Sequence, residues 1–146
     1  MTKPNRREGR RLAMIAMYSI ECTAYPVANT LRLMREIKPD WAVIPEFAVQ
    51  LCEAVETHQQ EIERDISSVL EHWKMGRVSP IERAILKLGC AEILYLPDIP
   101  PKVTINEYIE LAKKYANEHA PAFINGVLYK LAHLAQKADF EAPKKT

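Results

Sequence analysis

Apolar residues recur every three or four positions along most of the chain, which is the spacing of the buried face of an α-helix. The prolines fall between these periodic runs or at their first positions, where a missing amide hydrogen is tolerated. The pattern predicts an all-α fold of about seven helices, near residues 5–24, 27–37, 45–57, 59–74, 79–95, 104–117 and 120–137.

Three of the predicted helix starts carry a capping side chain three positions before a glutamate: Asn5 with Glu8, Ser79 with Glu82, and Thr104 with Glu107. Such a pair can satisfy the unpaired amide groups of the first helical turn reciprocally. Between the last two of these starts, three prolines predict a stiff non-helical connector at residues 96–102.

The composition favours one compact domain. The 146 residues (16.7 kDa) have the length of an ordinary domain, and 48% apolar residues with only 4 glycines exclude a disordered or collagen-like chain. No run approaches the ~18 to 20 apolar residues of a membrane span, and the N-terminus resembles no signal peptide. Three scattered cysteines, Cys22, Cys52 and Cys90, favour buried thiols in a reducing cytosol over a disulfide framework. We therefore predict a cytoplasmic protein with no membrane partner.

The net charge of +1 hides an uneven distribution. Residues 1–11 contain five basic residues and one acidic residue, whereas residues 53–71 contain six acidic residues and one arginine. A basic cluster of this kind is the electrostatic footprint of a phosphate-binding surface. The composition therefore leaves nucleic-acid binding open at the N-terminal end.

The motifs of enzymes and metal sites are missing. Four isolated glycines cannot form a phosphate-binding loop, and the four histidines have neither HExxH nor ExxH spacing. Ser79 is assigned to a helix cap, and the remaining serines lack the sequence context of a nucleophile. We expect no catalysis, no cofactor and no metal.

The first predicted helix presents four arginines in its first two turns, at positions 6, 7, 10 and 11. Guanidinium groups bind phosphate oxygens in pairs, and a helix N-terminus adds amide donors, so this end suits RNA or DNA. The arginines could instead only keep the protein soluble. Tyr18 and Phe123 are candidate stacking partners for unpaired bases, although either could equally lie in the core.

Several segments resemble one known family. The opening RREGRRLAMIAMY resembles the arginine-rich first helix of the NusB family of bacterial transcription antitermination factors. The second half resembles the same family over some sixty residues, with IERAIL, DIPPKVTINEYIELAKKY and FINGVL as its specific blocks.

The resemblance implies an all-helical domain of two small packed bundles, residues 1–57 and 58–137, followed by a polar tail at 138–146. It implies binding to the boxA segment of ribosomal RNA transcripts together with NusE, a ribosomal protein of the small subunit. It also implies assembly with other Nus factors on RNA polymerase, and it leaves open whether the free protein forms a homodimer.

The resemblance also assigns site residues. Arg6, Arg7 and Arg10, together with Lys3, would hold the RNA backbone, and Tyr18, Phe123 and Asn125 would lie toward the same region. Glu82 would face NusE, in competition with its predicted role in the helix cap.

Two other interpretations keep the fold. In one, the protein is an adaptor that binds only proteins through its acidic middle segment. In the other, it is a stand-alone relative of the accessory domain of ribosomal RNA methyltransferases, although the chain contains no glycine-rich cofactor-binding half.

Overall fold

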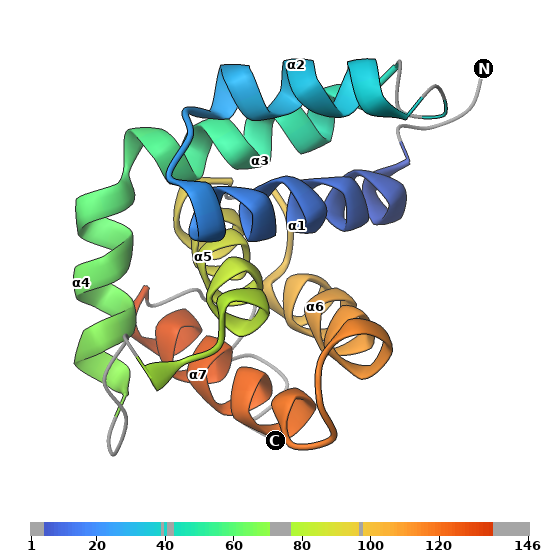
Figure 1. Cartoon of the computed structure of the whole chain (residues 1–146). Helices are drawn as coiled ribbons and strands as arrows, with labels where there is room; N and C mark the ends of the chain where they lie inside the picture. The colour runs from blue at the N-terminus through green and yellow to red at the C-terminus, as the bar shows by residue number, and fades with distance from the viewer. Residues whose placement is uncertain (1–4, 39, 41–42, 71–76, 97, 136–146) are drawn as a thin grey trace.

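The computed structural model describes residues 5–38, 40, 43–70, 77–96 and 98–135 (Figure 1). Within these residues there are seven α-helices and no strand, so the all-α prediction is confirmed. No helix in this part of the chain is long and apolar enough to cross a membrane. The helices are α1 (Arg6–Thr23), α2 (Val27–Ile37), α3 (Glu46–Thr57), α4 (Gln59–Val69), α5 (Pro80–Tyr95), α6 (Pro101–Tyr115) and α7 (Ala120–Leu134).

Helix α5 is the centre of the fold. It packs against α1, α3, α4, α6 and α7, and every residue from Ala84 to Ile93 is buried. In Figure 1, α1, α2 and α3 lie on one side of α5, and α6 and α7 lie on the other. A single cluster of buried apolar side chains draws on all seven helices. The proposed division into sub-bundles at residue 57 stays a prediction, and the tail at 138–146 lies outside the described residues.

Two glycines allow close helix packing. A methyl group added at Gly89 of α5 would lie 2.8 Å from a terminal carbon of Leu128 in α7. One added at Gly9 of α1 would lie 3.2 Å from the Phe47 ring of α3. The missing side chains therefore set how closely α5 approaches α7 and α1 approaches α3.

Two of the three predicted caps are present. The Asn5 side chain accepts a hydrogen bond from the amide of Glu8 at 3.0 Å. Ser79 and Glu82 form a complete capping box, with Pro80 at the first helical position. These local signals placed the starts of α1 and α5 to within one residue.

The third predicted cap is wrong. Helix α6 begins at Pro101, one turn before Thr104, because a proline at the first position needs no amide partner. Thr104 is instead buried inside the helix, and its hydroxyl donates to Glu92 Oε2 at 2.7 Å. The predicted connector at 96–102 is correspondingly shorter. The predicted extensions of the fourth and seventh helices fall mostly on residues 71–74 and 136–137, outside the described part of the chain.

The cysteines agree with the prediction in part. Cys52 and Cys90 are fully buried, and burial raises the pKa of each thiol to about 12. Cys22 is exposed near the end of α1, so the expectation of a buried thiol is wrong there.

A buried ion pair connects three helices. The Arg10 guanidinium of α1 donates from Nε to Glu92 Oε1 at 3.0 Å and from Nη2 to Oε2 at 2.5 Å. The Arg10 side chain is 3% exposed and the Glu92 side chain is 0% exposed. Glu92 lies in α5, and Thr104 of α6 completes its hydrogen bonding. Two charges this deep in the core are tolerated only because each neutralises the other.

Replacing Arg10 by alanine is expected to lower the free energy of unfolding by about 3–5 kcal/mol, because Glu92 would be left buried without its counter-charge. The control, Arg6→Ala, removes an exposed arginine of the same helix together with its contact with the Phe47 ring, and is expected to lower stability by no more than about 1 kcal/mol. Urea denaturation of both variants measures the difference. Similar stabilities would contradict a structural role for the Arg10–Glu92 pair.

Candidate nucleic-acid interface

One face of α1 carries two of the candidate residues, Arg7 and Tyr18, together with Arg11. Because the helix turns by 100° per residue, Arg7, Arg11 and Tyr18 share this face over roughly 16 Å of helix length. Arg7 and Tyr18 are exposed, and Arg11 is half-buried. This face turns toward α6, where it meets Glu107.

Carboxylates hold both arginines of this face. Arg7 donates from Nε and Nη2 to the two oxygens of Glu107, at 3.1 and 2.9 Å. Arg11 binds Glu8 in the same way, at 2.9 and 2.6 Å. The hydrogen bond from Arg7 lowers the pKa of Glu107, and the hydrogen bond from Arg11 lowers the pKa of Glu8. Both carboxylates are therefore held in their charged form.

The other two arginines meet at one aromatic ring. The guanidinium carbons of Arg6 and Arg10 lie 5.5 and 5.3 Å from the centre of the Phe47 ring. Arg6 is exposed, and no carboxylate in the described residues pairs with it. Arg10 points inward to Glu92, so the expectation that it lies on an exposed turn is wrong. The reason is the buried charge of Glu92, which binds the arginine that faces α5.

A hollow of about 410 Å³ lies between α1 and α6, and we call it the arginine groove. Its lining contains three cations and three carboxylates as well as one leucine: Arg7, Glu8, Arg11, Glu107, Glu110, Leu111 and Lys114. Tyr115, near the end of α6, is 43% exposed. Its hydroxyl joins Glu8 in raising the pKa of Arg11, so it lies beside the groove.

A second hollow, of about 480 Å³, lies where the starts of α5 and α7 meet the turn after α6, and we call it the aromatic pocket. It is lined by Arg77, Val78, Ser79, Glu82, Asn117, His119 and Phe123. The pocket therefore brings together Phe123, predicted to bind RNA, and Glu82, predicted to bind a protein partner. The same lining places the Arg77 guanidinium, the Asn117 amide and the His119 imidazole in one pocket with the Phe123 ring.

Phe123 and Glu82 each combine two roles. Phe123 is half-buried and packs against the edge of the core while its ring also lines the pocket. Glu82 Oε1 accepts hydrogen bonds from the Ser79 hydroxyl at 2.8 Å and from the Ser79 amide at 3.3 Å. The capping role is thus compatible with a position at the wall of the pocket.

The end of α6 connects the two hollows. Lys114 lines the arginine groove, and Asn117, three residues later, lines the aromatic pocket. Three residues of chain span at most about 11 Å, so the adjoining edges of the two hollows lie within this distance of each other.

Two further predicted residues, Tyr18 and Asn125, lie apart from these linings. Lys3 is outside the described residues. Asn125 is exposed on α7 but does not line the aromatic pocket, and Tyr18 is exposed further along α1.

Sequence reasoning missed the segment that connects the hollows. Residues 113–119, KKYANEH, contain two lysines, a tyrosine, an amide and an imidazole at the end of a helix. This mixture of basic, aromatic and amide groups is typical of RNA-binding surfaces and was a usable signal. No comparable sequence feature indicated Arg77, which also lines the aromatic pocket.

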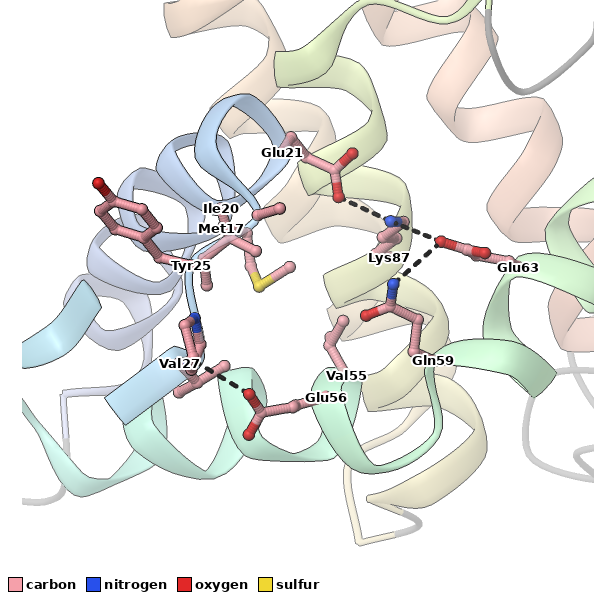
Figure 2. A pocket seen from close by; sticks show the side chains of 12 residues that line it. Met17, Ile20, Glu21, Tyr25, Val27, Val55, Glu56, Gln59, Glu63 and Lys87 are labelled. Atoms are coloured by element: carbon pink, nitrogen blue, oxygen red, sulfur yellow. Dashed lines mark hydrogen bonds and ion pairs between the residues drawn. The ribbon is translucent and has the colours of Figure 1, made fainter. Parts of the chain in front are cut away.

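A third hollow, of about 460 Å³, lies between the end of α1, the start of α2 and helices α3, α4 and α5 (Figure 2). Figure 2 shows Lys87 donating to Glu21 at 2.7 Å and to Glu63 at 3.0 Å. Glu56, on the opposite wall, accepts from the amide of Val27 at 3.0 Å. Three carboxylates against one lysine make this hollow unfavourable for phosphate. Of these three hollows, the arginine groove and the aromatic pocket are therefore the candidate interface.

The family model for the NusB family matches residues 7–133. The chain belongs to the NusB family. The matched segment includes all seven helices except the first residue of α1 and the last residue of α7, so the arginine groove and the aromatic pocket lie inside it.

Relatives within the NusB family are similar over nearly their whole length. The transcription antitermination protein NusB of Geobacter sulfurreducens is 41% identical over 128 residues, which cover 87% of this chain and 93% of the relative. The protein of the same name from Myxococcus xanthus is 37% identical over 137 residues, covering 87% and 94%.

Solved structures agree with this assignment. A structure of T. maritima NusB superimposes with a TM-score of 0.81 at 31% identity, covering 97% of this chain and 99% of the other. A crystal structure of the antitermination factors NusB and NusE in complex with double-stranded RNA has a TM-score of 0.76 at 27% identity, covering 88% and 96%.

Proposed function

We propose that this protein is a transcription antitermination factor that binds boxA RNA of ribosomal RNA transcripts together with NusE. In this role it assembles with other Nus factors on RNA polymerase in the cytoplasm. It acts by binding alone and catalyses no reaction. The names of its relatives and the similar NusB–NusE–RNA complex support this proposal.

The observation that carries the proposal is the pairing of the two hollows. The arginine groove supplies cations that can hold the RNA backbone, and Arg6 adds an exposed cation on another face of α1. The aromatic pocket offers the Phe123 ring for stacking, with amide and imidazole groups that can bind the edge of a base. Stacking on a side chain requires an unpaired base, so this arrangement favours single-stranded RNA.

The wall of the aromatic pocket suggests how NusE takes part. Glu82 lies in the same lining as Phe123, so a protein bound at Glu82 would also contact RNA held at Phe123. The RNA would then be bound between two proteins, and each partner would strengthen the binding of the other.

NusE is expected to tighten RNA binding, because this protein alone offers many groups that hold the RNA backbone but few that read bases. Titrating a fluorescent boxA oligonucleotide and a scrambled one, each with and without NusE, measures the effect. We expect a larger gain for boxA than for the scrambled sequence. Equal affinity with and without NusE would contradict a composite site.

The double variant Arg6→Ala/Arg7→Ala is expected to bind RNA more weakly. The slope of log affinity against log salt should fall by roughly 0.7 for each phosphate that the variant no longer neutralises. The matched control is Arg32→Ala/Arg35→Ala, which removes two exposed arginines from α2. If both double variants bind RNA as tightly as the parent protein, Arg6 and Arg7 only confer solubility. That result would favour the interpretation of the protein as an adaptor that binds only proteins.

Phe123→Ala is expected to weaken RNA binding by about 1–3 kcal/mol, because the ring can no longer stack on a base. Since the ring is only half-buried, the decrease in unfolding free energy should stay below the ~3–5 kcal/mol of a fully buried phenylalanine. Tyr25→Ala removes an exposed aromatic ring away from both hollows and serves as the control. A large decrease in stability with unchanged RNA affinity would place Phe123 in the core alone.

A further inference from the structure

We infer that Glu107 is an intramolecular competitor for RNA phosphate: it holds Arg7 in the free protein and keeps RNA affinity below the level that the arginines alone would give. The inference rests on the proposed function, because it concerns the same surface.

The geometry of the pair is that of a phosphate contact. Arg7 directs two N–H groups, from Nε and Nη2, to the two oxygens of Glu107 at 3.1 and 2.9 Å. Guanidinium binds phosphate through the same parallel pair of N–H groups. A phosphate that used this pair would have to displace the carboxylate.

The two side chains differ in freedom. The Arg7 side chain is 80% exposed, whereas the Glu107 side chain is largely buried between α6 and α1 and is only 18% exposed. Arg7 can therefore turn toward solvent while Glu107 stays in place. An exposed pair of this kind is weak, so RNA can break it, although the break subtracts from the binding free energy.

A second arginine compensates Glu107 once Arg7 leaves. Arg10 Nη1 lies 3.9 Å from Glu107 Oε1, and Arg10 is itself fixed in the core by Glu92. The carboxylate thus keeps a counter-charge in both states, which makes exchange of Arg7 between Glu107 and RNA feasible.

The test is Glu107→Gln, which keeps the shape of the side chain and removes its charge. We expect about three- to tenfold tighter binding to a single-stranded boxA oligonucleotide, with a steeper salt dependence. Glu53→Gln, an exposed glutamate of α3, makes the same change in net charge outside the groove and controls for it. Thermal unfolding confirms that both variants are folded.

A double-mutant cycle isolates the role of Arg7. In an Arg7→Gln background, Glu107→Gln should bring no more gain than Glu53→Gln, because the arginine to be released is missing. A gain that persists without Arg7 would overturn the inference in favour of a general charge effect. Weaker binding by Glu107→Gln would overturn it too, since Glu107 would then position Arg7 for RNA.

RNA binding by this protein and competition by Glu107 can be tested separately. If the parent protein shows no salt-dependent RNA binding, the proposed function fails and the inference fails with it. If the parent binds RNA and Arg6→Ala/Arg7→Ala weakens binding, while Glu107→Gln matches Glu53→Gln, only the inference fails.

Discussion

The buried ion pair between Arg10 and Glu92 fixes the orientation of α1, and the candidate interface depends on it. A carboxylate in the middle of the most buried helix requires a cation, and Arg10 is the arginine that faces it. With Arg10 turned inward, the helical period turns Arg7 and Arg11 toward α6 and leaves Arg6 on the Phe47 ring. One interaction therefore divides four adjacent arginines into a structural residue and three surface residues.

The electrostatics of the surface follow from this division. The arginine groove balances its cations with Glu8, Glu107 and Glu110, so its field is weaker than the sequence of the first helix suggests. In the proposed function, a phosphate that binds here has to displace a carboxylate from its arginine. The affinity of the surface then depends on how firmly each carboxylate holds its arginine, which differs between the exposed Arg7 and the half-buried Arg11.

Helix α6 and the turn that follows it contribute charged groups to one hollow and an amide and an imidazole to the other. Its outer face contributes carboxylates and a lysine to the arginine groove, and the turn that follows contributes Asn117 and His119 to the aromatic pocket. The Ser79–Glu82 cap fixes the start of α5 at the same pocket. A local hydrogen-bonding motif thereby also shapes a surface suited to RNA and a protein partner.

The sequence alone determined the helical class, the order of the seven helices and the starts of α1 and α5, because periodicity and capping depend on residues only a few positions apart. Its specific blocks also indicated the family. Only the tertiary structure decided which arginine is buried, that Thr104 lies inside a helix and binds Glu92, and that Tyr115 is exposed. The first two depend on a partner in another helix: Arg10 and Glu92 are 82 positions apart, and Thr104 and Glu92 are 12 positions apart. The pair that defines the arginine groove, Arg7 and Glu107, is separated by 100 positions. The periodicity and capping signals of the sequence concern residues a few positions apart, so they carry no information on such pairs. The packing of α1 against α5 and α6 decides which charges meet.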